Sequence, residues 1–305
     1  MSRPIVVVGS LNMDFVVRVD ALPERGQTVS GRGFTMLPGG KGANQACAVG
    51  RLGGRCRMVG RVGHDLFGER LKASLADAGV DTTNVLATEG EATGVALIPV
   101  EAGGQNLIVV AGGANLLLRP GDVEVALGAV EDGLLLVQLE SPADTVEAAL
   151  ACARRRGMTT VLDPAPARPL PPALLRAVDI LTPNETEALL LLGQRGSDVS
   201  VEEAAALGRR LRELGSRTVI LKLGAKGAYV ADAEGGRHFP VRAVAAVDAT
   251  AAGDTFNGAL AVALAEHGDT AEAIAFANVA ASISVTRLGA QASIPTRDEV
   301  DALRR

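Results

Sequence analysis

Aromatic side chains are almost missing from this sequence of 305 residues, which contains no Trp, one Tyr and six Phe. Proteins that bind single-stranded nucleic acid stack the bases on aromatic side chains, so this scarcity argues against that class. The formal net charge of −5 points the same way, because it gives no general attraction for phosphate backbones. Nucleic acid is therefore not an expected partner, and the core must be built from aliphatic side chains.

Cysteine and long apolar segments are also scarce. Cys47, Cys56 and Cys152 include no Cys-x-x-Cys pair, which indicates a reducing cytoplasm and no metal cluster. The three histidines share no metal-ligand spacing, and no G-x-S-x-G sequence marks a hydrolase. No uninterrupted apolar stretch approaches the roughly 18 residues of a membrane helix, and the N-terminus lacks the pattern of a signal peptide. We therefore expect a soluble cytoplasmic protein with no membrane partner.

Short apolar runs alternate with helical patterns along most of the chain. Near-continuous apolar runs are typical of parallel strands that are covered on both faces. The predicted buried strands are residues 5–8, 57–62, 134–139, 160–162, 179–181 and 219–223. We predict an α/β fold in which a doubly wound, mostly parallel sheet is flanked by helices and residues 1–305 form one domain.

Sequence signals also mark several helix ends. Pro142 follows a serine that suits the N-cap, so we expect Pro142 at the first helical position. Ser200 and Glu203 have the spacing of a capping box, and Gly215 is the expected C-cap of that helix. A last short helix is expected to open after residue 296.

Two stretches break the alternation of strands and helices. Residues 14–38 and 93–111 have the pattern of hairpins with alternating faces and contain no helical pattern. We therefore predict a small β-sheet outside the main sheet. Such a sheet can act as a lid over a ligand, as a dimerisation surface, or as both.

The most informative segment is residues 247–259, VDATAAGDTFNGA. Small residues let the backbone approach a ligand, and the apolar pattern that follows predicts a helix beginning near Gly253. The unpaired N–H groups and positive dipole end of a helix start suit a phosphate or a developing oxyanion. Asp254, ionised at pH 7 with an ordinary pKa near ~3.9, can take a proton from an attacking hydroxyl. The alternative is that Asp254 is only a first-turn acid favoured by the helix dipole.

A second segment, residues 38–46 (PGGKGANQA), places glycines ahead of a predicted helix. Exposed N–H groups there, together with Lys41 and Asn44, could bind a ligand. The segment lacks the hydroxyl residue and first glycine of a P-loop, and residues 9–14 lack the glycines of a dinucleotide fingerprint. The alternative is a flexible loop before a capped helix.

Polar residues also follow two predicted strands. Asn12 and Asp14 come after the first strand, and Glu140 comes at the end of the strand that precedes Pro142. Ligands of open α/β sheets bind outside the carboxyl ends of the strands, so these positions suit a binding site. The alternatives are a polar turn and an ordinary helix-entry residue.

Two further segments have both a structural and a functional interpretation. Asn184 and Glu187 have the spacing of a capped helix start, and the same polar groups can hold water around a magnesium ion. Residues 222–227 (KLGAKG) follow a strand and form either a phosphate-binding turn or a hairpin. Local sequence leaves both choices open.

In this order and spacing, the segments resemble the ribokinase family of sugar kinases (the PfkB group) from GSLNMD at 9–14 to TRLGA at 286–290. The resemblance implies transfer of the γ-phosphate of ATP to the 5-hydroxyl of ribose, with Mg²⁺ or another divalent cation and with K⁺ as activator. It also implies that the hairpins form a β lid that pairs two subunits into a homodimer. Other acceptors (fructose, a deoxy-keto sugar acid or a nucleoside) stay open, as does a catalytically silent sugar-binding regulator on the same fold.

The resemblance also implies roles for individual residues, each at a position that matches a motif of the family. The implied general base is Asp254. The implied anion hole is formed by the N–H groups of Ala251, Ala252 and Gly253. The implied sugar ligands are Asn12, Asp14, Gly40, Lys41, Asn44, Glu140 and Asp254. The implied nucleotide-binding residues are Asn184, Glu187, Lys222, Leu223, Gly224, Ala225, Lys226, Gly227, Gly253 and Asn278.

The implied metal ligands fall into two sets. Asn184 and Glu187 face the magnesium, through water. The implied ligands of the monovalent cation, several of them backbone carbonyls, are Asp248, Thr250, Ser284, Arg287, Gly289 and Ser293. Three positions stand out against the family's usual pattern: Ala249 replaces a small hydroxyl residue, Pro or Val, Lys222 replaces a frequent Thr, and Asn278 occupies a nucleotide-facing position that varies in the family. The shortage of aromatics then predicts a sugar pocket that works by hydrogen bonds and an adenine site with aliphatic walls.

Overall fold

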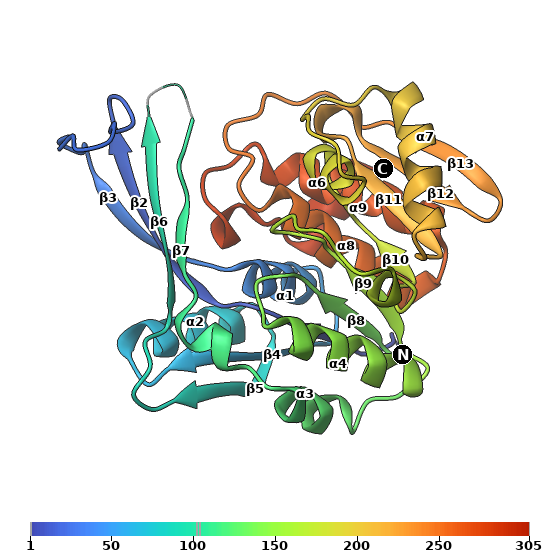
Figure 1. Ribbon diagram of the computed structural model, residues 1–305, viewed down its shortest axis with the longest axis horizontal. Helices are drawn as coiled ribbons and strands as arrows, with labels where there is room; N and C mark the ends of the chain where they lie inside the picture. The colour runs from blue at the N-terminus through green and yellow to red at the C-terminus, as the bar shows by residue number, and fades with distance from the viewer. Residues whose placement is uncertain (1, 102, 104, 305) are drawn as a thin grey trace.

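The computed structural model describes residues 2–101, 103 and 105–304, so Ala102 and Gly104 of the second predicted hairpin lie outside the described residues, as do both chain ends (Figure 1). In the described ranges, nine strands form the main sheet and four form a smaller one. The strands of the main sheet, from edge to edge, are β13 (Gly235–Phe239), β12 (Ala228–Asp232), β11 (Thr218–Lys222), β10 (Ile180–Leu181), β9 (Thr159–Leu162), β8 (Leu134–Val137), β1 (Ile5–Val8), β4 (Cys56–Gly63) and β5 (Asp81–Thr88). From β11 to β5 the strands run parallel, and β12 and β13 add an antiparallel edge. The predicted parallel sheet is confirmed.

Alternation along the buried strands explains the two helical layers. Ile5 and Val7 of β1 pack into one hydrophobic core, and Val6 and Val8 pack into the other, because successive strand residues point to opposite faces. The helices of the first core are α1 (Lys41–Arg51), α2 (Leu66–Asp77), α8 (Ala252–His267), α9 (Thr270–Ser284) and α10 (Arg297–Arg304). The helices of the second core are α3 (Pro120–Leu127), α4 (Ala143–Arg155), α5 (Pro172–Leu175), α6 (Glu185–Leu191) and α7 (Val201–Glu213). None of the helices in the described ranges is both long and apolar enough to cross a bilayer.

Two predicted helix ends are wrong by one residue. Pro142 is the N-cap of α4 and not its first helical residue, because the first helical hydrogen bond runs from the Val146 N–H to the Pro142 carbonyl. Ser200 and Glu203 form the predicted capping box of α7. The C-cap of α7 is Leu214, however, and Gly215 follows it at φ +141°.

The smaller sheet forms where the two hairpins were predicted. Its strand order is β3 (Phe34–Gly39), β2 (Asn12–Val19), β6 (Gly94–Glu101) and β7 (Val109–Ala111). Each hairpin is antiparallel, and the two hairpins join through the parallel pair β2 and β6. This lid sheet projects beyond the helices of the main sheet, at the left of Figure 1. The chain passes from β1 directly into β2 of the lid sheet. The lid sheet therefore meets the carboxyl edge of the main sheet at Asn12.

Candidate active site

Polar residues gather at the carboxyl ends of neighbouring parallel strands. Asn12 follows β1, Glu140 follows β8, Asn184 follows β10, and Lys222 ends β11. Asp163 directly follows β9 and completes the row, although it was not predicted. The rule that selected Asn12 and Glu140, a polar residue just after a buried strand, could have found Asp163 as well.

The strand ends and the start of α8 enclose a cavity of about 380 Å³. Its lining residues are Lys41, Asp163, Asn184, Glu185, Thr186, Glu187, Lys222, Gly224, Ala249, Ala251, Gly253 and Asp254. The residues in this lining that were not predicted as site residues are Asp163, Glu185, Thr186 and Ala249. The structure therefore brings together the predicted base, two of the three predicted anion-hole residues and part of the predicted nucleotide set, namely Asn184, Glu187, Lys222, Gly224 and Gly253.

The start of α8 has the geometry expected of an oxyanion site. Ala251 is its N-cap and adopts a left-handed conformation at φ +58°, which costs roughly 1–2 kcal/mol for a residue with a Cβ. In the described ranges, the N–H groups of Ala251 and Gly253 have no acceptor. The N–H of Ala252 donates to the Ala249 carbonyl at 3.2 Å. Two of the three predicted N–H groups are thus free to bind an anion.

Asp254, in the first turn of α8, is buried and held from two sides. Asn44 Nδ2 donates to one carboxylate oxygen at 3.0 Å, and Gln45 Nε2 donates to the other at 3.1 Å. Burial raises the pKa of Asp254 to about 6, although Lys41 lowers it; the charge of Asp163 adds to the rise. The expectation of an ordinary pKa near 4 is therefore wrong. The carboxylate is still mostly ionised at pH 7, but it binds a proton far more readily than an exposed aspartate does.

A second group of acids lies next to Asp254. Glu140 accepts hydrogen bonds from Ser10 Oγ at 2.5 Å and from the Lys41 N–H at 3.2 Å. Burial raises the pKa of Asp14 to about 7, and the charges of Glu140 and Asp254 contribute to the rise. Since these carboxylates influence one another, they face a common region, as the predicted sugar ligands should.

Amide side chains complete this end of the site. Asn115 was not predicted, and it fixes Asn12: its Nδ2 donates to Asn12 Oδ1 at 2.8 Å while its Oδ1 accepts from the Leu11 N–H at 2.9 Å. The Oδ1 of Asn44 is buried and has no partner in the described ranges, so it can accept a hydroxyl proton. Gly40 has φ +90°, and a Cβ there would lie 2.7 Å from the Asn12 nitrogen. Only glycine fits this close approach.

Lys41 stands between the two ends of the site. Burial alone lowers the pKa of its ammonium, but nearby carboxylates outweigh that effect and raise it. The carboxylates concerned are Asp254, Asp163, Glu140 and Glu187. The Lys41 ammonium is therefore charged at neutral pH, close enough to these carboxylates to be stabilised by them, and it lines the cavity.

Asn184 and Glu187 form the capped helix start that their structural interpretation predicts. Asn184 Oδ1 accepts from the Glu187 N–H at 2.8 Å, and the Glu187 carboxylate accepts from the Asn184 N–H at 2.7 Å and from its Nδ2 at 2.9 Å. Burial raises the pKa of Glu187 even though Lys222 opposes the rise. Both residues also line the cavity, so the capping box does not remove them from the site.

Residues 222–227 form the turn of a hairpin between β11 and β12, through the short 3₁₀ helix η2 (Gly224–Lys226). Lys222 Nζ forms an ion pair with Asp163 Oδ1 at 2.9 Å. Lys226 pairs with Glu185 and Asp198, both at 2.7 Å, which ties this turn to α6 and to the loop before α7. The hairpin interpretation is correct for the backbone, and Lys222 still reaches the cavity.

The remaining predicted nucleotide residues differ in position. Gly224 lines the cavity and Ala225 is exposed, whereas Leu223 and Gly227 are buried. Asn278 lies on α9, outside the cavity lining, and its amide donates to the Phe239 carbonyl at 3.1 Å.

Three of the predicted cation ligands meet around one carboxylate. Asp248 accepts from the Thr250 N–H at 2.9 Å, from Thr250 Oγ1 at 2.6 Å and from the Gly289 N–H at 2.9 Å. Burial raises the pKa of Asp248, but these hydrogen bonds outweigh it and lower the pKa. Asp248 therefore stays ionised and joins two turns that are far apart in the sequence.

The other predicted cation ligands use their side chains elsewhere. The hydroxyls of Ser284 and Ser293 donate to the carbonyls of Ala281 and Ala290, and Arg287 pairs with Glu299 at 2.6 Å. Any contact of these three residues with a cation would therefore be through backbone carbonyls, in line with the expectation for several of the set.

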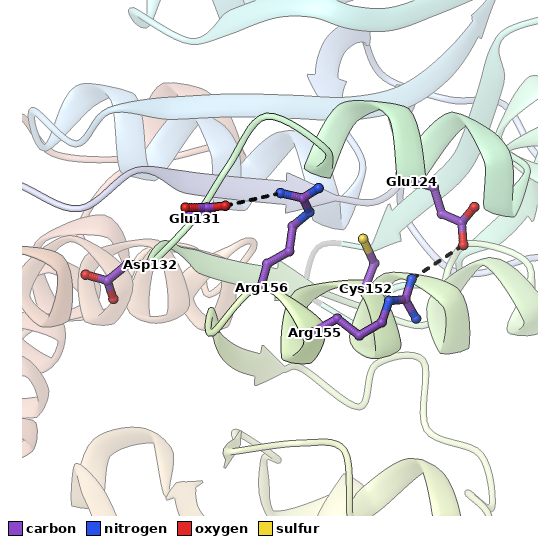
Figure 2. Close-up of a pocket in the computed structure, with 6 residues that line it drawn as sticks. All are labelled: Glu124, Glu131, Asp132, Cys152, Arg155 and Arg156. Atoms are coloured by element: carbon purple, nitrogen blue, oxygen red, sulfur yellow. Dashed lines mark ion pairs between the residues drawn. The ribbon is translucent and has the colours of Figure 1, made fainter.

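A roomier cavity, of about 730 Å³, opens between α3 and α4. Figure 2 shows its charged lining, in which Arg155 pairs with Glu124 at 3.6 Å and Arg156 pairs with Glu131 at 3.9 Å. It lies beside the segment that enters β8, at the amino end of the sheet and opposite the row of strand carboxyl ends. Position and chemistry both favour the smaller cavity as the active site.

Comparison with known proteins covers nearly the whole chain. The family model described as pfkB family carbohydrate kinase matches residues 2–297. The ribokinase of Haemophilus influenzae is 41% identical over 305 residues, covering 98% of this chain and 97% of its own length. That of Bacillus subtilis is 41% identical over 304 residues and covers 99% of both chains.

Solved structures agree with this result. The ribokinase of Thermotoga maritima has a TM-score of 0.89 at 40% identity, over 99% of this chain and 100% of its own. The Arabidopsis thaliana ribokinase, solved with ribose and ATP, has a TM-score of 0.89 at 35% identity over 99% of both chains. The similarity therefore includes the main sheet, the lid sheet and the site together.

Proposed function

Because this chain belongs to the pfkB family of carbohydrate kinases, we propose that it acts as an ATP-dependent kinase of D-ribose. It transfers the γ-phosphate of ATP to the 5-hydroxyl of ribose and gives ribose 5-phosphate and ADP. The observation that carries this conclusion is that Asp254 and Gly253 are neighbours in the chain. A buried proton acceptor and an unpaired N–H donor stand on consecutive residues at the start of α8.

The reaction follows from this arrangement. As the 5-hydroxyl oxygen forms its bond to the γ-phosphorus, the hydroxyl proton moves to the Asp254 carboxylate. The bond between the γ-phosphorus and the bridging oxygen breaks, and that oxygen leaves with ADP. The Gly253 N–H donates to an oxygen of the transferred group, where negative charge is stabilised by the helix start. Asn44 holds the carboxylate in place throughout.

Hydrogen-bonding groups supply the sugar pocket. Asn12, Asn44, Asp14 and Glu140 offer amide and carboxylate partners for hydroxyls, and the charges of the two acids disfavour an acidic sugar. No Trp exists in the chain to stack on a sugar ring or on a nucleoside base. This polarity favours a neutral polyol such as ribose as the acceptor.

A divalent cation fits the cavity where the phosphates would lie. The carboxylates of Asp163, Glu187 and Asp254 outnumber the two lysines of the lining, and the charge of Glu185 is already balanced by Lys226. Hard oxygen ligands and a negative excess suit Mg²⁺, which shields phosphate charge when bound. We place it near Asn184 and Glu187, with water between ion and protein.

A monovalent cation fits the turns around Asp248. The carboxylate stays ionised, and the backbone around Thr250 and Gly289 is drawn together by it. Carbonyl oxygens in such turns suit a large, weakly hydrated ion, so we assign K⁺ as activator. K⁺ held there would supply positive charge close to the start of α8.

The lid sheet supplies a surface for a homodimer. Its exposed apolar residues include Phe34 and Leu97 of the sheet, together with Ile108 and Val109 at the end of the second hairpin, all more than half exposed. Apolar groups gathered on one projecting sheet favour pairing with a second copy, which would also cover the sugar pocket.

The three free, buried cysteines fit the reducing cytoplasm that we propose as the location of the protein.

The direct test is ADP release from ATP across a panel of sugars, with and without K⁺. D-ribose is expected to give the highest kcat/KM, and K⁺ is expected to raise the rate. A higher kcat/KM with fructose or with a deoxy-keto sugar acid would reassign the acceptor. Sugar binding without ADP release from any sugar would instead support a catalytically silent regulator.

A further inference from the structure

Asp163 is a buried carboxylate at the floor of the site, 3% exposed, with two side-chain partners. It accepts from Lys222 Nζ at 2.9 Å and from Gln45 Nε2 at 3.0 Å. The same Gln45 nitrogen donates to Asp254 at 3.1 Å. An amide nitrogen has two hydrogens, so Gln45 joins the two carboxylates with one hydrogen each.

The orientation of Gln45 is fixed from its other side. Gln138 Nε2 donates to the Gln45 carbonyl at 2.7 Å, and Gln45 itself is 1% exposed. The Gln45 nitrogen must therefore face Asp163 and Asp254, because a flipped amide would lose all three hydrogen bonds. The distance that the Asp254 carboxylate can move is limited by Asp163 through this bridge.

Lys222, the second partner, stands at the opening of α8. A Cβ on Gly253 would lie 3.3 Å from the Lys222 Nζ. An ammonium ion beside the positive end of a helix is unfavourable unless an anion lies nearby. In the described ranges, the carboxylate bonded to this ammonium is that of Asp163. Asp163 thereby holds a positive charge at the point where a phosphoryl group would arrive.

We propose that Asp163 is a positioning residue for the kinase reaction: through Gln45 it orients the Asp254 carboxylate, and through Lys222 it holds an ammonium beside Gly253 for the transferred phosphoryl group. The role rests on the proposed function, since it assigns a use to the same site. Asp163 acts through its two partners. Its negative charge also makes Asp254 a stronger base, in line with the raised pKa of that group.

The test compares pH–rate profiles of the wild type and Asp163→Asn, which keeps the shape and removes the charge. The charged groups that face Asp254 are Lys41, Asp14 and Asp163, so loss of one negative charge lowers the pKa of Asp254. We expect the acidic limb of kcat to move to lower pH by about one unit, and kcat to fall more than the KM for ribose changes. Glu185→Gln is the matched control, because Glu185 lines the same cavity but pairs with Lys226.

The outcomes separate a positioning role from a structural one. A shifted limb in Asp163→Asn with an unmoved limb in Glu185→Gln supports the proposal. An unmoved limb in both variants, or an equal shift in both, overturns it. A double-mutant cycle of Asp163→Asn and Lys222→Met, measured by thermal melting, is a second test. Lys222→Met alone leaves the buried Asp163 carboxylate without its counterion, so the double variant should melt at a higher temperature than Lys222→Met alone. Additive effects would contradict the pairing.

A measurement without turnover distinguishes this proposal from the function it rests on. Carbon-13 NMR of labelled aspartates, with Asp254→Asn to assign the signal, follows the titration of Asp254 directly. A lower titration midpoint in Asp163→Asn supports the coupling even if no sugar releases ADP, in which case only the proposed function fails. An unchanged midpoint overturns the coupling even in an active kinase.

Discussion

Asp248 and Asp254 stand six residues apart on one segment and have opposite electrostatics. Asp248 is half-buried and accepts three hydrogen bonds from Thr250 and Gly289, which lower its pKa although burial opposes them. Asp254 is buried, and burial raises its pKa to about 6 although Lys41 opposes the rise. Hydrogen bonds keep the Asp248 carboxylate ionised, whereas the Asp254 carboxylate is ionised at pH 7 but binds a proton far more readily.

This difference matches two different kinds of work. A cation ligand must hold its negative charge at every working pH, and backbone N–H donors secure that charge at Asp248. A general base must accept a proton and release it again, so its pKa should lie near the working pH. In the proposed function, the start of α8 would therefore separate a site for a resident ion from a site for a moving proton.

The largest expected effect comes from removing the base. Asp254→Asn should lower kcat by about a thousandfold or more, because the 5-hydroxyl loses its proton acceptor. The new amide oxygen can accept from Asn44 or from Gln45 but not from both. Ribose affinity, measured by calorimetry, should change little. A kcat within tenfold of the wild type would contradict the role of Asp254.

The pH dependence of the wild type is the next largest effect. Protonation of Asp254 removes the base, so kcat should fall about tenfold per pH unit below its pKa of about 6. In the enzyme without ribose, Asp14 also titrates, and its pKa is about 7. Because kcat/KM reports on the free enzyme, kcat/KM for ribose should begin to fall at higher pH than kcat. Asp14→Asn should remove that separation. Identical profiles for kcat and kcat/KM in the wild type would show that Asp14 does not titrate in the sugar pocket.

The contrast between these two acids could be predicted only in part. Local motifs select Asp254, Asn44 and the α8 start, because small residues before an apolar pattern form a recognisable helix entry. Asp248 was predicted only through the family resemblance. The supporting groups could not be selected in this way. Gln45 meets Asp254 across 209 positions of sequence, and that contact depends on how α1 packs against α8.

The pKa values depend on packing in the same way. An aspartate in the first turn of a helix is expected to be acidic, and only its burial beneath α1 reverses the direction. The positions of the strands were more accessible, since each buried strand is an apolar run followed by a turn. Asp163 directly follows such a run and is predictable by the same rule. Pro142 shows that a helix start is predictable to within about one residue.

A smaller effect is expected at the cation turns. Asp248→Asn removes the charge and keeps one acceptor oxygen, for Gly289 or for Thr250 but not for both. K⁺ activation should therefore need about tenfold more K⁺, equivalent to ~1.4 kcal/mol. The acidic limb of kcat should stay where it is in the wild type. Titration of the rate with KCl, with NaCl holding the ionic strength, measures both. A shift of the limb would show that the two acids are not independent.

The smallest effect is on stability, and it has opposite signs at the two acids. The folded pKa of Asp254 lies above its unfolded value, so its contribution to stability is fully present below pH ~4 and is lost as pH rises through about 6. A rise from 3.8 to about 6 corresponds to at most about 3 kcal/mol. Asp254→Asn should therefore melt a few degrees above the wild type at pH 8, and the gap should close toward pH 4.

Asp248 has a lowered pKa and stabilises the fold above its unfolded pKa, so Asp248→Asn should melt below the wild type at pH 8 and approach it as the pH falls. Thermal melts of both variants across this pH range measure the two gaps, and gaps of the same sign would show that burial and hydrogen bonding do not divide these two carboxylates.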